Sequence, residues 1–198
     1  MSDDDRLLDD RLLDDRLLDD RLLDTLAMIQ ARGAIGERSL LDAVAHADRF
    51  VTLIPPGQRT VVDLGSGGGL PALVIAWRRA DVTVTLIERR QARADLLRRA
   101  VSALELDDRA QVAGMQVGEL AGSVGATFDV VTARSFGSVA KTAAAIGALL
   151  SVGGLALVSE PPTGRDEEWR AALAGRDDLE DLGTEQGIRR LQRRRCST

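Results

Sequence analysis

Cysteine is almost absent from this chain of 198 residues, which has only Cys196. A single thiol cannot form a disulfide or a thiolate zinc site within one chain, and this favours the reducing cytoplasm. The first residues are acidic and lead into no apolar run, so we expect no secretory signal. The longest uncharged stretch, residues 142–159, contains Gly153 and Gly154, and therefore predicts a helix, a turn and a buried strand rather than a membrane span. We expect a cytoplasmic monomer with neither a metal nor a membrane anchor.

Strong net charge is also missing from most of the chain. The formal charge is −5, but residues 1–24 alone hold ten Asp and four Arg, a net of −6, so the remaining residues carry +1. A nearly neutral body gives no bulk electrostatic sign of nucleic-acid binding, although local arginine clusters can still contact phosphates.

A short repeat accounts for the acidic end. Four copies of DDRLL fill residues 4–23. A step of five residues advances about 140° around a helix, so the leucines form no single apolar stripe, and the heptad spacing of a coiled coil is absent. We predict that residues 1–24 are a low-complexity tail. A partner-binding helix or an oligomerisation arm is the alternative.

The rest of the chain alternates between strand and helix patterns. A helical segment broken near Gly33 and Gly36 is followed by a stop at Pro55 and Pro56. Apolar helical spacing between the second and third strand runs predicts a helix there. This alternation predicts a mostly parallel sheet with helices on both faces. The predicted strands cover residues 60–64, 82–88, 110–114, 128–133 and 155–160, with a further strand near 187–192 and a helix near 167–174.

The most informative segment, VVDLGSGGGLP at residues 61–71, runs from a strand into a helix. Glycines there allow tight turns and a close approach of the backbone to a ligand. A dinucleotide-binding loop would follow GxGxxG, but counting from Gly65 puts Leu70 at the third glycine position. The pattern is instead that of S-adenosylmethionine-dependent methyltransferases, an acidic residue followed by GxGxG. It is formed by Asp63, Gly65, Gly67 and Gly69. The alternative is an ordinary glycine-rich turn.

Glu88 ends the second predicted strand. A carboxylate at the carboxyl end of a neighbouring strand can accept hydrogen bonds from both ribose hydroxyls of a bound nucleoside. The alternative is a solvated acid that pairs with Arg89 or Arg90. We predict the ribose role, and with it a Rossmann-like class I methyltransferase fold. In this reading residues 25–58 form a helical cap and residues 59–198 form the nucleotide-binding core.

These residues resemble the RsmG/GidB family of bacterial methyltransferases, whose characterised members methylate a guanine N7 in small-subunit ribosomal RNA. The resembling segments are DLGSGGGLP at 63–71, LIE at 86–88, VGEL at 117–120 and FDVVTARSFG at 128–137. The resemblance implies S-adenosyl-L-methionine as the cofactor and ribosomal RNA as the partner. It also implies cofactor contacts from Gly65, Leu70, Val117, Gly118 and Arg134. Arg134 is otherwise a charged residue at a strand end.

Two further residues are candidates for substrate contact. The only histidine, His46, precedes the sheet, and the family has a histidine in this helix. Phe136 follows the fourth strand and is a candidate to stack on an extruded base. Packing is the alternative for both side chains.

The chain also departs from the family pattern. The region before the first strand is short, and Ser159, Glu160, Pro161 and Pro162 stand where the family has a Leu-Lys-Gly turn. We expect Glu160 to put an acid near the substrate opening. A small-molecule methyltransferase and a non-catalytic cofactor-binding regulatory protein are therefore the alternative functions.

Overall fold

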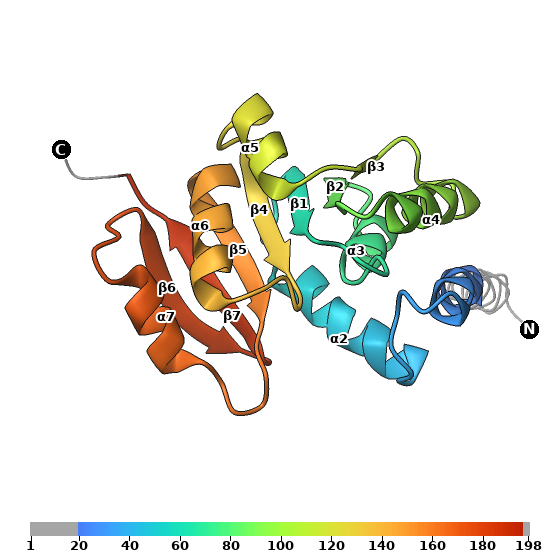
Figure 1. Ribbon diagram of the computed structural model, residues 1–198, viewed down its shortest axis with the longest axis horizontal. Coiled ribbons are helices and arrows are strands. Elements are labelled where there is room, and N and C mark those ends of the chain that lie inside the picture. Colours follow the sequence, from blue (N-terminus) through green and yellow to red (C-terminus); the bar gives the residue numbers. More distant parts are fainter. Residues whose placement is uncertain (1–19, 196–198) are drawn as a thin grey trace, which may run out of the picture.

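The computed structural model describes residues 20–195, and Figure 1 shows them as one mixed sheet with helices on its two faces. The strand order is β3-β2-β1-β4-β5-β7-β6. Strands β1 to β5 are parallel, whereas β7 is antiparallel to both β5 and β6. The first three DDRLL copies and Cys196 lie outside the described residues. The strands are β1 Thr60–Leu64, β2 Thr83–Ile87, β3 Ala110–Ala113, β4 Phe128–Ala133, β5 Leu150–Ser159, β6 Leu179–Glu185 and β7 Ile188–Arg193.

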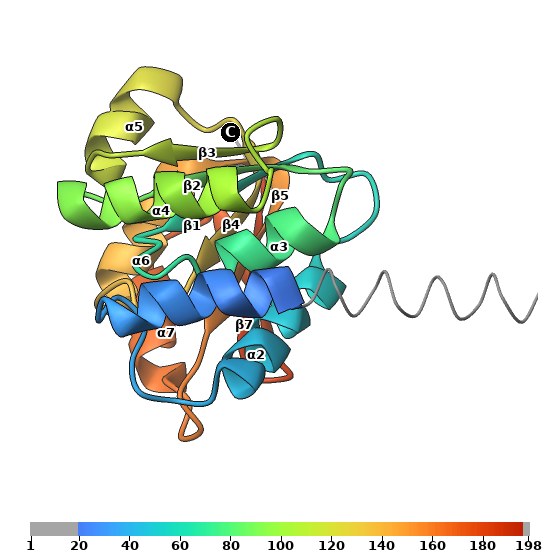
Figure 2. The same ribbon diagram turned by 90° about the vertical axis from the view of Figure 1, so that its right-hand side faces the viewer.

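Helices cover both faces of the sheet, so the central strands are buried on each side (Figure 2). Successive strand residues alternate between two apolar layers: Val61 packs in one layer and Val62 in the other. The first layer holds a helix over residues 20–31 with α2, α3 and α4, and the second holds α5, α6 and α7. The helices are α2 Leu40–Leu53, α3 Ala72–Arg78, α4 Gln91–Ala103, α5 Val117–Val124, α6 Val139–Leu149 and α7 Asp166–Leu173. The predicted α/β fold is confirmed.

The helix over residues 20–31 includes most of the fourth DDRLL copy. Leu22 and Leu26 are fully buried in the first layer, and Arg21 Nη2 donates to the carbonyl oxygen of Ala103 at 3.1 Å. Residues 20–24 therefore pack with the folded domain, whereas the sequence prediction assigned them to the tail. The apolar face of this copy is buried because the helix lies against α4, a tertiary contact that the repeat pattern does not encode.

Strand β5 differs from its prediction at its start. It begins at Leu150 and continues through Gly153 and Gly154, where a turn was predicted. A Cβ atom on Gly154 would lie 2.8 Å from the backbone oxygen of Asp129, so glycine permits close pairing with β4 at this irregular point. The two glycines thus accommodate an irregularity in the pairing of β5 with β4 and do not form a turn between a helix and a strand.

Strand β6 was not predicted. Its sequence, LEDLGTE, has three acids and a glycine, residue types that are uncommon in strands. Because β6 is the edge strand of the sheet, its side chains need not be buried. No helix among residues 20–195 is long and apolar enough to span a bilayer.

Candidate functional site

The glycine loop connects β1 to α3 at the carboxyl edge of the parallel strands. Gly65 has a φ of +64°, in the left-handed region that favours glycine. A Cβ atom on Gly65 would lie 2.9 Å from Phe136 Cδ2, so the loop and the segment after β4 approach each other closely here. Sheets of this kind bind ligands at the carboxyl ends of their strands. The loop therefore lies at the expected binding edge.

Glu88 follows β2 and is connected to the glycine loop. Its Oε2 accepts a hydrogen bond from the Gly67 N–H at 3.2 Å, and its Oε1 accepts one from the Arg90 N–H at 2.8 Å. The residue is 6% exposed. Each carboxylate oxygen can accept more than one hydrogen bond, so both oxygens keep acceptor capacity for a ligand. Two backbone donors fix the orientation of the carboxylate beforehand.

Glu88 and the glycine loop border a cavity of about 280 Å³, which we call the smaller pocket. It brings together four residues predicted to bind the cofactor and Phe136, a predicted substrate residue. These are Gly65, Glu88, Val117, Gly118 and Phe136, and the pocket also includes Arg90, Gln116, Ser135 and Lys141. Lys141 Nζ lies 4.9 Å from the centroid of the Phe136 ring.

Other predicted cofactor residues lie behind the loop rather than along the smaller pocket. Asp63 is 1% exposed, and its Oδ1 accepts a hydrogen bond from Thr132 Oγ1 at 2.7 Å. Its Oδ2 has no hydrogen-bond partner among the described residues. Burial raises the pKa of Asp63, and the hydrogen bond from Thr132 opposes that shift. Leu70 is buried, and the pocket lining includes neither it nor Gly67 and Gly69.

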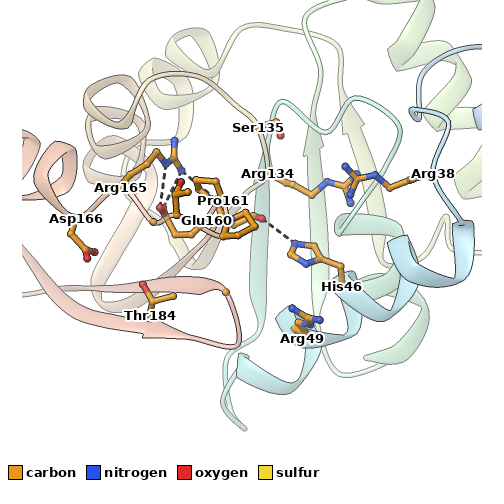
Figure 3. Close-up of a pocket in the computed structure, with 15 residues that line it drawn as sticks. Arg38, His46, Arg49, Arg134, Ser135, Glu160, Pro161, Arg165, Asp166 and Thr184 are labelled. Atoms are coloured by element: carbon orange, nitrogen blue, oxygen red, sulfur yellow. Dashed lines mark hydrogen bonds and ion pairs between the residues drawn. The ribbon is translucent and has the colours of Figure 1, made fainter.

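A second cavity of about 1020 Å³, the larger cleft, adjoins the smaller pocket at Ser135, which lines both. Figure 3 shows cationic side chains reaching it from separate parts of the chain. Arg38 comes from the segment before α2, His46 and Arg49 from α2, and Arg134 from the end of β4. The segment after β5 forms the opposite wall, with residues 159–166.

Arg134 was predicted to contact the cofactor, and the structure puts its side chain in the larger cleft. Its Nη1 is buried with no hydrogen-bond partner among the described residues. Burial and then the nearby charge of Arg38 lower the pKa of Arg134, while the carboxylate of Asp63 raises it. A partly buried guanidinium with an unused donor is a suitable contact for an anionic group of a ligand.

His46 lies in the same cleft, and its Nε2 is 3.0 Å from Ser159 Oγ. Burial lowers the pKa of His46, and the charges of Arg134, Arg49 and Arg38 lower it further. The imidazole is therefore neutral at pH 7. It can share a hydrogen bond with a substrate group without adding another positive charge to the cleft.

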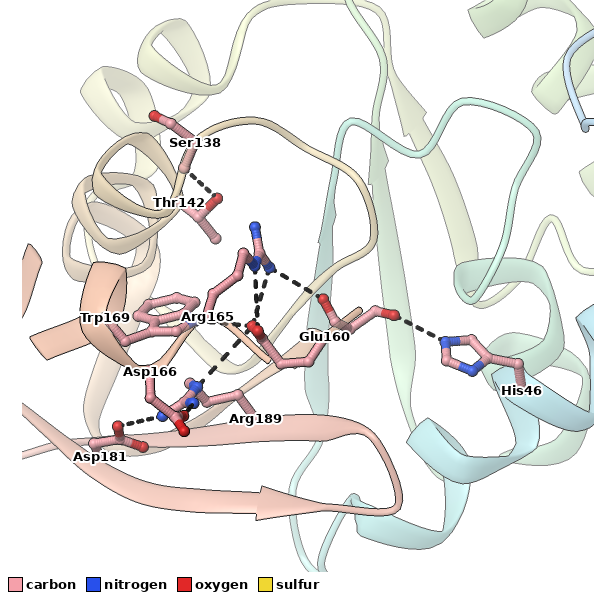
Figure 4. Close-up of polar contacts among 10 residues, drawn as sticks. His46, Ser138, Thr142, Glu160, Arg165, Asp166, Trp169, Asp181 and Arg189 are labelled. Atoms are coloured by element: carbon pink, nitrogen blue, oxygen red, sulfur yellow. Dashed lines mark hydrogen bonds and ion pairs between the residues drawn. The ribbon is translucent and has the colours of Figure 1, made fainter. Parts of the chain in front are cut away.

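Glu160 does not present a free acid to the substrate opening, contrary to the sequence expectation. Its side chain is 2% exposed and turns toward α7, as Figure 4 shows. Its Oε1 accepts hydrogen bonds from Trp169 Nε1 at 2.8 Å and from Arg165 Nη2 at 3.0 Å. The nearly buried Arg189 has its Nε 4.0 Å from the same oxygen. These cations compensate the carboxylate, and Arg165 brings a cation to the wall of the cleft.

His46 and Phe136 lie in different cavities, because Phe136 faces the smaller pocket. Arg38 and Arg49 also line the larger cleft and were not predicted from the sequence. Helical spacing offered one usable signal, since Arg49 follows His46 by three residues and so shares its face of α2. Arg38 precedes the helix and gave no such signal.

The sheet order and the glycine loop at the end of β1 define the Rossmann-like fold of class I S-adenosylmethionine-dependent methyltransferases. The S-adenosylhomocysteine-bound methyltransferase PaMTH1 of Podospora anserina has this fold, with a TM-score of 0.65 and 14% sequence identity over 89% of this chain and 88% of its own. The family model GidB, described as rRNA small subunit methyltransferase G, matches residues 24–171, so the chain belongs to that family.

Two curated relatives carry the name ribosomal RNA small subunit methyltransferase G. The protein of Acidothermus cellulolyticus is 34% identical over 161 residues, which are 79% of this chain and 68% of the relative. The protein of Salinispora tropica is 44% identical over 105 residues, which are 51% of this chain and 41% of the relative. The similarity therefore leaves about a third of the first relative and more than half of the second unmatched.

Proposed function

We propose that the chain transfers a methyl group from S-adenosyl-L-methionine to a guanine N7 of small-subunit ribosomal RNA. The observation that carries this proposal is the junction of two unlike cavities at Ser135. One is a small pocket beside a glycine loop, and the other is a large cleft with arginines on its walls. Membership of the GidB family supports the reaction and the RNA substrate.

The residues of the smaller pocket fit the methyl donor. Gly65 lets the loop backbone border the pocket without a side chain, and Glu88 has acceptor capacity for a ribose diol. In this proposal Val117 and Gly118 border the adenine. The donor's methionine end then extends past Ser135 toward the larger cleft, where the unused Nη1 of Arg134 can bind its carboxylate.

When bound, S-adenosylmethionine supplies an electrophilic methyl group on a sulfonium. The lone pair of guanine N7 forms the new bond to the methyl carbon as the carbon–sulfur bond breaks. The electron pair of the broken carbon–sulfur bond remains on sulfur. N7 carries no proton before the transfer, so the chain needs no general base. Its contribution is to hold the two reactants in line and close together.

The larger cleft is the proposed acceptor site. Arg38 and Arg49 form no ion pair with any described carboxylate and can neutralise phosphates of an RNA strand. Neutral His46, held by Ser159, is the proposed contact to the guanine or its ribose. Phe136 is proposed to act on the donor side, because it lines the pocket with Gly65.

The test combines binding and transfer with the full chain. Calorimetry with S-adenosylhomocysteine measures the donor site, and methyl-deuterated S-adenosylmethionine with a small-subunit rRNA transcript or purified small subunits measures transfer. We expect micromolar binding and deuterated 7-methylguanosine after nuclease digestion and mass spectrometry. Binding without labelled 7-methylguanosine on either RNA would contradict the proposed acceptor, and no binding would contradict the proposed donor.

A further inference from the structure

Three arginines that pair with no described carboxylate gather beside α4, and two of them, Arg32 and Arg99, lie outside the two cavities of the proposed reaction. Some surface arginines form ion pairs, as the exposed Arg194 does with Glu180 and the partly exposed Arg109 with Asp108. In contrast, Arg32, Arg93 and Arg99 form no ion pair with any described carboxylate. The contrast matters because a paired arginine is already neutralised, whereas an unpaired one attracts anions.

The three unpaired arginines line one concavity of about 500 Å³, which we call the arginine pocket. It lies between the end of the helix over residues 20–31 and the first turns of α4. Its only acid, Asp95, is 2.6 Å from Arg98 Nη1, so its charge is compensated. Arg32 and Arg99 are exposed and Arg93 is partly buried. The pocket therefore presents net positive charge to solvent.

The two helices that form the arginine pocket are fixed relative to each other. They lie side by side in Figures 1 and 2 and run antiparallel, since Arg21 bonds to Ala103 at one end while Arg32 lies near Ala92 at the other. Leu26 and Ile29 from one helix and Leu97 from α4 share the first apolar layer. This packing gives the arginines a rigid base.

The arginine pocket is continuous with the proposed site. Arg93 lines both the arginine pocket and the smaller pocket. The segment after Arg32 then packs over the glycine loop, where a Cβ atom on Gly68 would lie 2.7 Å from the Ala34 carbonyl oxygen. The same segment reaches the larger cleft at Arg38. Arginines that pair with no described carboxylate thus extend from α4 to Arg38 at the larger cleft.

We propose that the arginine pocket binds backbone phosphates of the RNA substrate, away from the nucleotide that is methylated. This inference rests on the proposed function, because it assigns a second contact surface to the same RNA. Contacts to phosphate orient an RNA without reading its bases, and each adds to the salt dependence of binding. The surface would hold the RNA strand while the target guanine enters the larger cleft.

The test uses the double variant Arg32→Gln/Arg99→Gln in the full chain, since these two residues line only the arginine pocket. Binding to a fluorescent small-subunit rRNA transcript is measured over a series of salt concentrations. We expect about tenfold weaker binding near 0.1 M salt, and a plot of log affinity against log salt that is shallower by about 1.4 to 1.8.

The matched control is Arg109→Gln/Arg194→Gln, which removes the same charge from two ion-paired arginines. We expect wild-type RNA affinity and salt slope for this control, and wild-type S-adenosylhomocysteine binding for both variants. Equal losses in the two double variants would overturn the inference, and so would an unchanged slope in the first. A wild-type chain without donor binding or methyl transfer would contradict the proposed function instead, so the two failures are distinguishable.

Discussion

The smaller pocket and the larger cleft each contain one buried glutamate, and the two carboxylates are held in different ways. Glu88 accepts hydrogen bonds from two backbone N–H groups and keeps acceptor capacity toward a pocket. Glu160 accepts from the side chains of Arg165 and Trp169, and its charge is compensated within the wall of the cleft. A buried acid beside a cavity can therefore bind a ligand or stabilise the fold. Its hydrogen-bond donors distinguish these roles: Glu88 has backbone donors and spare acceptor capacity, whereas Glu160 has cationic and aromatic side chains as partners.

The largest expected effect is on stability, from Glu160→Ala. Removing the buried carboxylate leaves Arg165 without its ion-pair partner and Trp169 Nε1 without its acceptor, which costs about 3 kcal/mol or more. We expect the free energy of unfolding, measured by urea denaturation, to fall by that amount. The control Glu185→Ala removes a partly exposed ion pair with Arg190 and should cost less than about 1 kcal/mol. Equal losses in the two variants would show that Glu160 does not anchor the wall.

The next effect concerns the affinity for the methyl donor, through Glu88→Ala. Two hydrogen bonds from ribose hydroxyls to a charged acceptor would be lost, which predicts about 100-fold weaker S-adenosylhomocysteine binding in calorimetry. Glu88→Gln keeps one acceptor oxygen and should weaken binding less, by about tenfold. Glu105→Ala, at an exposed acid paired with Arg21, is the control and should bind normally. Normal binding by Glu88→Ala would refute the ribose role.

A smaller effect separates the two cavities. His46 lines the larger cleft but not the smaller pocket, so His46→Ala should lower kcat/KM for the RNA about tenfold and leave donor affinity unchanged. Steady-state kinetics with a small-subunit rRNA transcript, paired with donor calorimetry, checks both quantities. Weaker donor binding by His46→Ala would contradict the assignment of the smaller pocket to the donor and of the larger cleft to the acceptor.

The smallest effect is the titration of His46. Because burial and three neighbouring arginines lower its pKa, the folded chain binds this proton more weakly than the unfolded chain does. The stability that neutral His46 contributes is present above the unfolded pKa of about 6.5 and is lost as the pH falls below it. The chain has one histidine, so NMR titration of its ring protons is unambiguous. We expect a folded-state pKa below 6.5, and a value above 6.5 would contradict the geometry.

The smaller pocket was largely predictable from sequence because its key features are local. The strand at residues 60–64 and the glycine loop after it form one continuous segment, and Glu88 ends the next strand. The glycine motif depends on the backbone conformations of consecutive residues, so the same residue pattern predicts the same loop in other sequences. For the same reason the strand at residues 128–133 was predicted with its observed bounds.

The larger cleft was not predictable, because it is assembled from side chains far apart in the sequence. Arg38, His46 and Glu160 meet only after α2 packs beside the end of β5, and no sequence spacing encodes that contact. The orientation of Glu160 depends on α7 and β7, which supply Trp169 and Arg189. Strand β6 was missed because an edge strand can be polar, so its pattern carries little strand signal.

The most direct test of the account is a crystal structure of the chain with S-adenosylhomocysteine. We predict the adenosine in the smaller pocket, its ribose hydroxyls within hydrogen-bond distance of the Glu88 carboxylate, and its sulfur near Ser135 with the larger cleft still open. Adenosine bound in the larger cleft beside His46 and Arg49, with the smaller pocket closed by Phe136, would contradict the division into donor pocket and acceptor cleft.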